Sequence, residues 1–168
     1  MLYEATIPQF IKMLRNLNHI LSKGETYAES KKVDFNVLLQ SRLFPDQFPL
    51  AKQIQIACDT AKLGVARVIG KDAPVHDDTK VTLPELRTRI EEVIGFLNSV
   101  KAQDFEGADE RKITTPRWEG KWMTGKEFVV QHVTPNVYFH VTTAYAILRH
   151  NGVEVGKKDY LGEMPFKS

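Results

Sequence analysis

Cysteine and excess charge are both scarce in this sequence of 168 residues. Its one cysteine, Cys58, excludes an intrachain disulfide framework and is typical of a reducing compartment, so we expect a cytoplasmic protein. The 23 basic and 21 acidic residues are intermixed and leave a net charge of only +2. Because no basic stripe results, the sequence disfavours nucleic acid as a partner.

Long apolar runs and common catalytic motifs are missing as well. No run approaches the roughly 18 apolar residues that a membrane-spanning helix needs, so we expect no membrane partner. The first residues lack the basic region, apolar run and cleavage site of a secretory signal. There is no G-x-S-x-G, glycine-rich phosphate loop, H-E-x-x-H or paired C-x-x-C motif. These absences disfavour the common hydrolases, nucleotide enzymes and zinc fingers.

The sequence does contain four amphipathic helical patterns, and a 42% share of hydrophobic residues fits one globular domain over residues 1–168. Apolar residues recur at spacings of three and four, which places them on one face of each helix. Glycines and T-x-x-E capping boxes mark several of the helix ends. The expected helices run from Thr6 to Lys23 (stopped by Gly24), from Phe48 to Ile69, from Thr82 through residue 100, and from Thr124 to His150.

A small β-hairpin is predicted between the third and fourth helices. The segment RKITTPRWEGKWMTG carries β-branched residues and two tryptophans, with Glu119-Gly120 between them as a turn. Four helices of this kind bury their apolar faces best in a bundle. We therefore predict an all-α fold, a four-helix bundle with one hairpin, in which an up-down-up-down order is not required. Phe44, Phe48 and Leu50 are expected to cover one end of the bundle.

A polar stripe follows the fourth helix. His132, Asn136 and His140 are spaced by four residues and therefore share one helix face, which Thr143 continues. Such a stripe beside an apolar row is typical of a ligand site in a bundle core, and equally of the rim of a solvent-exposed face. Pro135 lies within the stripe and removes a helical hydrogen bond, so a kink between the two histidines is expected.

His140 has three interpretations from its surroundings alone. It is a metal ligand, a base that works near neutral pH, or a hydrogen-bonded core residue. On the second helix, Gln55 and Asp59 flank the inner face. Asp59 is placed to approach His140 as a second ligand or as an orienting carboxylate, or to form a surface ion pair with Lys62.

Several segments resemble a bacterial family of unknown function within the DinB/YfiT-like superfamily. They are MLYEATIPQFIKML, DTAK, MTGKEF and NVYFHVTTAYAILRHNGVEVGKKDYLG, and the similarity covers nearly the whole chain. The resemblance implies a cytoplasmic four-helix bundle that is often a homodimer. It also implies a divalent metal, zinc or nickel, held by one histidine of the second helix and an H-x-x-x-H pair of the last helix. In several branches that metal supports hydrolysis or thiol transfer.

Only part of the three-histidine site that the resemblance implies is present in this sequence. His140 matches the last histidine, but Asn136 stands four residues before it, and the second helix offers Gln55 and Asp59 in place of a histidine. The candidate metal ligands are therefore His140, Asn136 and Asp59, and His132, His140 and Gln55 are the candidate lining of a ligand pocket.

Three functional hypotheses remain open from the sequence. In the first, the protein lacks the full three-histidine site and binds a small ligand, or acts in a regulatory or stress-associated role. In the second, it is a divalent-metal-dependent hydrolase or thiol transferase with a divergent site around His140. In the third, it is a structural protein that only dimerises. Whether it is an enzyme stays undecided at this stage.

Overall fold

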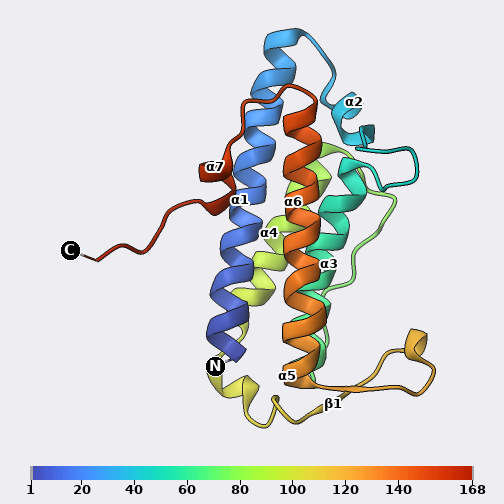
Figure 1. Cartoon of the computed structure of the whole chain (residues 1–168), viewed down its shortest axis with the longest axis vertical. Coiled ribbons are helices and arrows are strands. Elements are labelled where there is room, and N and C mark those ends of the chain that lie inside the picture. Colours follow the sequence, from blue (N-terminus) through green and yellow to red (C-terminus); the bar gives the residue numbers. More distant parts are fainter. Residues whose placement is uncertain (1, 168) are drawn as a thin grey trace.

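Four long helices bury the apolar faces that the spacing predicted. The structure, a computed structural model, describes residues 2–167 and places these helices around one core (Figure 1). It confirms the all-α class and the four-helix bundle. The long helices are α1 (Leu2–Lys31), α3 (Leu50–Ile69), α4 (Leu83–Ser99) and α6 (Thr134–His150).

The helices do not alternate in direction. α1 and α6 run one way, whereas α3 and α4 run the other way, and the connection over residues 71–82 returns along the side of the bundle (Figure 1). Contacts between α3 and α4 agree with this parallel arrangement. Gln55 Nε2 donates to the carbonyl of Lys80, 3.3 Å away, and Asp59 pairs with Arg89 further along both helices. The long returning connection therefore lies against α3.

Shorter elements occupy the connections. The predicted hairpin is confirmed, since β1 and β2 pair antiparallel with Lys112 opposite Thr124. Its turn contains Glu119 and Gly120, both with positive φ. The short elements are α2 (Phe35–Gln40), η1 (Ala102–Phe105), β1 (Lys112–Ile113), η2 (Pro116–Trp118), β2 (Met123–Thr124), α5 (Gly125–Phe128), η3 (Val129–Val133) and α7 (Lys157–Leu161).

The first helix is longer than the sequence predicted. It starts before Thr6, whose hydroxyl donates to the carbonyl of Leu2 at 2.7 Å instead of capping the helix. It also continues through Gly24 to Lys31. A Cβ at Gly24 would lie 3.0 Å from the Phe35 ring and 3.2 Å from Leu148. This glycine therefore permits close packing, and the prediction that it stops the helix was wrong.

The fourth helical segment contains the distortion that Pro135 demands. Residues Val129–Val133 form a π-helical turn, in which the N–H of Thr134 bonds to the carbonyl of Val129. A π turn adds one residue to the helical repeat. The side chains before it are thereby rotated relative to those after it. His132 lies within this turn and lines a small pocket with Thr60, the residue that Asn136 contacts, so it stays on the side that faces α3.

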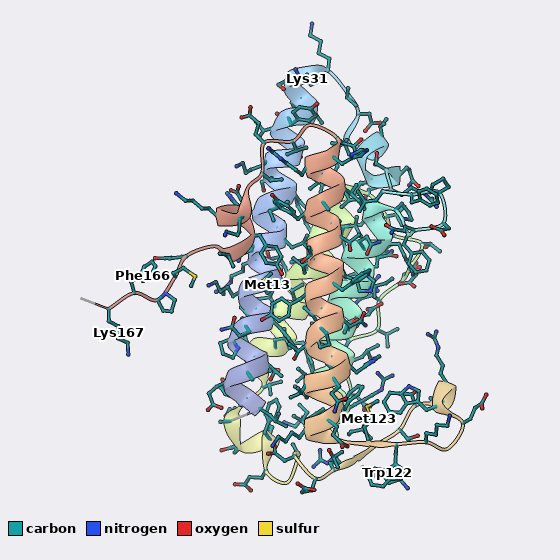
Figure 2. The ribbon with its side chains drawn as sticks, in the orientation of Figure 1. Met13, Lys31, Trp122, Met123, Phe166 and Lys167 are labelled. Carbon is teal, nitrogen blue, oxygen red and sulfur yellow. The ribbon has the colours of Figure 1, made fainter. Side chains whose placement is uncertain are left out.

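The chain before α3 does not cover the bundle end as expected. Leu50 is fully buried, but Phe44 and Phe48 are 63% and 55% exposed. The prediction was therefore right for Leu50 and wrong for the two phenylalanines. At the other end of the chain, Phe166 points away from the bundle and is 89% exposed (Figure 2).

Docking of α7 on α1 is expected to depend on pH through Asp159. Burial opposes ionisation, but the Gly156 N–H, Lys23 and His19 lower the pKa of this carboxyl to about 2. Because the folded pKa lies below the reference value of 3.8, the stabilisation is present at neutral pH and is lost as pH falls from about 4 to 2.

We expect Asp159→Asn to lower the free energy of unfolding by about 1 kcal/mol at neutral pH. The difference from the parent should shrink as the pH falls below about 4 and vanish only below about 2. Chemical denaturation of both proteins across this pH range measures it. A difference that stays constant with pH would contradict the role of the charged carboxylate.

Candidate functional site

His140 is held by a short hydrogen-bond relay between α6 and α3. Its Nδ1 lies 2.7 Å from Oε1 of Gln53, and Gln53 Nε2 donates to the carbonyl of Phe48 at 3.0 Å. The carbonyl can only accept, so the amide nitrogen of Gln53 faces it and the amide oxygen faces the imidazole. Nδ1 of His140 is therefore the protonated nitrogen.

The relay leaves Nε2 of His140 with its lone pair. Burial lowers the pKa of this imidazole below its usual value, and only 8% of the residue is exposed. The neutral form therefore predominates at neutral pH. Among the described residues, Nε2 has no hydrogen-bond partner. A neutral imidazole of this tautomer can accept a proton, a hydrogen bond or a metal ion at Nε2.

The other predicted site residues have different partners. Asn136 donates to the Thr60 hydroxyl at 3.1 Å, one turn from the His140 relay. Asp59 faces α4, where its carboxylate lies 2.7 Å from Arg89 and 3.1 Å from Lys62. The surface ion pair considered for Asp59 thus exists, but Lys62 is buried. These contacts do not bring Asn136 or Asp59 to His140.

Gln55 and His132 likewise contact residues other than His140. Gln55 Nε2 donates to the backbone carbonyl of Asp78 at 3.0 Å. His132 stacks on Phe128 with the ring centroids 5.3 Å apart, and it meets the edge of Trp118. A small pocket of about 110 Å³ does include His132 together with Asp59. The predicted pocket lining of His132, His140 and Gln55 stays a prediction.

The predicted metal set also stays a prediction. Within residues 2–167, no three histidine, cysteine, aspartate or glutamate side chains are gathered as a metal site requires. A metal held jointly by His140, Asn136 and Asp59 requires release of the Thr60, Arg89 and Lys62 contacts. The donor arrangement therefore does not fit a three-histidine transition-metal centre.

Sequence reasoning missed a second polar cluster, between α3, α4 and the 71–82 connection. Nε2 of His76 lies 2.9 Å from Glu92, and its Nδ1 contacts the Nζ of Lys62. Because a protonated lysine can only donate, Nδ1 accepts and Nε2–H donates to the carboxylate. Burial, then the charges of Lys62 and Arg89, lower the pKa of His76. Although His76 lies in a connecting segment, its side chain is only 8% exposed.

Arg89 forms the centre of this cluster. The residue is 5% exposed, and its NH2 lies 2.7 Å from Asp59 and 3.0 Å from Asp78. Its Nε and NH1 are buried without a hydrogen-bond partner. A pocket of about 320 Å³ adjoins it. The position of Arg89 in the sequence could have identified it, because Arg89 follows Leu86 by three residues and so falls on the apolar face of its helix.

Cys58 is a core residue. It has no exposed surface, and burial raises the pKa of its thiol to about 12. The thiolate is therefore negligible at neutral pH, which excludes Cys58 as a ready nucleophile.

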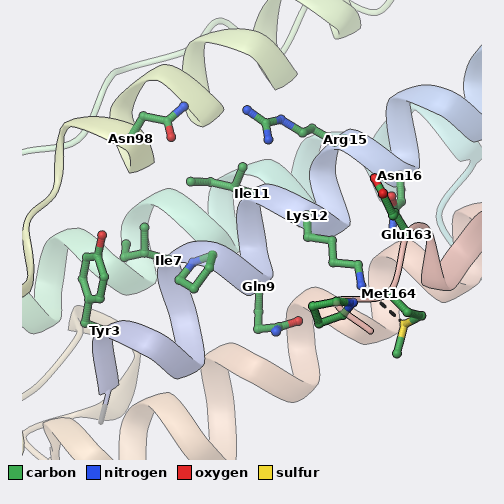
Figure 3. A pocket seen from close by; sticks show the side chains of 12 residues that line it. Tyr3, Ile7, Gln9, Ile11, Lys12, Arg15, Asn16, Asn98, Glu163 and Met164 are labelled. Carbon is green, nitrogen blue, oxygen red and sulfur yellow. Dashed lines mark hydrogen bonds between the residues drawn. The ribbon is translucent and has the colours of Figure 1, made fainter. Parts of the chain in front are cut away.

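A larger hollow of about 720 Å³ lies beside the first half of α1 (Figure 3). Ile7 and Ile11 of α1 line it together with Asn98 at the end of α4. The C-terminal segment forms one wall, where Lys12 Nζ lies 3.7 Å from the sulfur of Met164. None of the predicted site residues lines this hollow.

The chain is similar to known proteins in both sequence and fold. The family described as domain of unknown function DUF1993 matches residues 2–161. The crystal structure of a DinB family member from Shewanella denitrificans is 59% identical, with a TM-score of 0.98 over 100% of this chain and 96% of that chain. A search of curated proteins finds no match. In the described part of the chain, no helix is both long and apolar enough to cross a membrane.

Proposed function

Because the chain belongs to the DUF1993 family within the DinB-like superfamily, we propose that it binds a small organic ligand at His140 without a three-histidine metal site. The relay from Phe48 through Gln53 to His140 carries this proposal. It orients the imidazole and presents the Nε2 lone pair. A histidine with a purely structural role usually has both ring nitrogens hydrogen-bonded, whereas Nε2 of His140 has no partner among the described residues.

The surroundings of His140 indicate the chemistry of the ligand. Nε2 accepts a hydrogen bond, so the ligand carries an O–H or N–H donor. Phe139, the neighbour of His140 on α6, is 59% exposed, and Phe48 at the other end of the relay is 55% exposed. Exposed aromatic rings favour an apolar or aromatic body beside the donor. Phenols and aromatic alcohols combine both features.

A paired set of probes tests this proposal. We expect phenol to shift the ¹⁵N resonance of His140 Nε2 and toluene, which lacks the donor, to leave it unchanged. His140→Phe should weaken phenol binding by about tenfold or more, the loss of one buried hydrogen bond. His150→Phe, at the exposed end of α6, is the matched control. Equal binding of phenol and toluene, or an Nε2-protonated tautomer, would overturn the proposal.

The divergent metalloenzyme is the second candidate. A histidine whose Nδ1–H is held by a carbonyl oxygen is the arrangement that metal-binding histidines commonly show. Metal content of protein purified without a tag or chelator, by plasma mass spectrometry, separates the candidates. Stoichiometric zinc or nickel that is lost in His140→Ala would favour the metalloenzyme. Absence of metal even after reconstitution would eliminate it.

We also propose a homodimer, with a second copy as the partner of the C-terminal segment over residues 162–167. This segment leaves the bundle with Phe166 exposed, beside the hollow lined by Ile7 and Ile11 (Figure 3). An exchange of the two segments across a twofold axis would bury both. Truncation after Gly162 should then convert a dimer to a monomer in light scattering. A dimer that survives truncation would contradict this interface.

A further inference from the structure

We propose that the pocket beside Arg89 binds a small amino-acid-like zwitterion, with its carboxylate at Arg89 and its ammonium group at the acidic mouth. This site is separate from His140, and the inference does not rest on the proposed function. Three features carry it: unpaired buried donors, an inner end that is cationic, and an outer rim that is acidic.

The unpaired donors belong to a charged side chain. Only 5% of Arg89 is exposed to solvent, yet its Nε and NH1 atoms make no hydrogen bond within the described residues. Buried donors of charged groups are nearly always paired, because leaving one unpaired costs about 1–3 kcal/mol or more. Arg89 is also part of the wall of the 320 Å³ pocket. An acceptor that enters this pocket would satisfy the guanidinium.

The positively charged side chains of this cluster are more deeply buried than the negatively charged ones. Lys62 and Arg89 have side chains that are only 4% and 5% exposed. Their carboxylate partners lie nearer to solvent, with Asp59 28% and Asp78 54% exposed. The positive charges of Lys62 and Arg89 also help to lower the pKa of His76. The inner end of the cluster is therefore positively charged and attracts a carboxylate.

The mouth of the pocket has the opposite character. Asp77, Glu85 and Glu92 line the pocket together with the exposed Lys80, so carboxylates outnumber the ammonium group at the rim, and the Glu92 side chain is 56% exposed. These carboxylates repel a simple anion and attract an ammonium group. A ligand with both charges satisfies the two ends at once. The volume of about 320 Å³ is at the lower limit of small-molecule sites and suits a molecule of amino-acid size.

Entry of the ligand requires a small rearrangement at the rim. The Nε and NH1 atoms of Arg89 are covered in the ligand-free structure. Lys80 and Glu92 are exposed residues of the pocket lining and can rotate aside. Glu92 then exchanges His76 for the ligand ammonium as its partner, while Asp59 and Asp78 keep NH2 of Arg89 in place.

Nuclear magnetic resonance of the arginine side chains tests the site directly. The Nε–H signal of Arg89, assigned by its loss in Arg89→Lys, is followed during titration with each of the common amino acids. Acetate and methylamine serve as probes of one charge each. We expect at least one amino acid to shift this signal and to raise Tm, acetate to bind about tenfold more weakly, and methylamine to leave Arg89 unchanged.

Variants at both ends of the pocket distinguish this site from a structural ion-pair cluster. Arg89→Lys keeps the charge but loses the Nε–H and NH1 donors, so the response in Tm should disappear. Glu92→Gln should weaken binding by about tenfold without loss of fold, since Glu92 is exposed. Glu91→Gln, one residue away on α4 and outside the pocket lining, is the control and should bind normally.

Each result of these experiments either supports or overturns the zwitterion site. No shift of the Arg89 signal with any probe would mean that water satisfies these donors, and would overturn the proposal. Acetate binding as tight as that of every amino acid would remove the role of the acidic mouth. If Arg89→Lys fails to fold by circular dichroism, the comparison of Glu92→Gln with Glu91→Gln still decides, because a zwitterion site requires them to differ.

Discussion

Replacement of Arg89 by methionine is expected to destabilise the protein strongly. Arg89 pairs with Asp59 and Asp78 and is almost fully buried. Methionine fills similar space but leaves Asp59 without its nearest cation on α4. Removal of one partner from a buried ion pair costs about 3–5 kcal/mol, and we expect the lower end because both carboxylates are partly exposed.

The matched control for this prediction is Arg87→Met, two residues away on the same helix. Arg87 pairs with Glu25 at 2.8 Å, and both side chains are considerably exposed, at 31% and 44%. An exposed pair contributes about 1 kcal/mol or less. Urea unfolding of the three proteins compares the losses. If Arg89→Met were as stable as the parent, the cluster would contribute nothing to folding that an apolar side chain cannot replace.

Gly125→Ala is expected to have the second large effect, through backbone overlap. Gly125 begins α5, and a Cβ built on it would overlap the carbonyl oxygen of Ala108 and lie 3.1 Å from its carbon. Ala108 is fully buried, and the neighbouring Lys126 N–H bonds to the Asp109 carbonyl at 3.0 Å. Backbone cannot rotate aside as a side chain can. We therefore expect a loss of at least about 3 kcal/mol, the upper range for overpacking.

Gly95→Ala is the control for this substitution. Gly95 is exposed within α4, and nothing lies within 4 Å of the Cβ that alanine would add. Alanine favours the helix over glycine by about 1 kcal/mol, so this variant should be more stable than the parent. The two variants should move the urea midpoint in opposite directions. A small effect of Gly125→Ala would mean that the strand and α5 can separate without loss of packing.

Local chemistry was enough to predict the helices and several of their ends. Thr124 accepts from the Glu127 N–H at 3.2 Å, as the T-x-x-E pattern indicated, and α3 ends at Gly70 in a left-handed conformation. Spacing by three and four residues identified the buried faces correctly. Gly24 shows the limit of such signals. A glycine stops a helix or permits close packing within it, and only the positions of Phe35 and Leu148 decide between these roles.

The candidate site was predictable only in part. The sequence singled out His140, whose role in a site stays a prediction, but it did not single out the partner Gln53, since an amide among apolar residues carries no pattern of its own. The joint lining of a pocket by His132 and His140 stays a prediction, because helical projection assumes a constant repeat and the π turn interrupts that repeat. Pro135 can be read from the sequence, whereas the π turn that precedes it depends on tertiary packing.

The sequence by itself determined the helical faces, most of the helix boundaries, the hairpin and the family. The helical faces and boundaries follow from neighbours within about four residues, where spacing and capping chemistry act, whereas the family was identified by resemblance along nearly the whole chain. Only the tertiary structure decided which charges are buried together, because Lys62, His76 and Arg89 come from three separate elements. Their pairing depends on the parallel course of α3 and α4 and on the connection that returns beside them. Long-range contacts of this kind leave no periodic trace in one sequence.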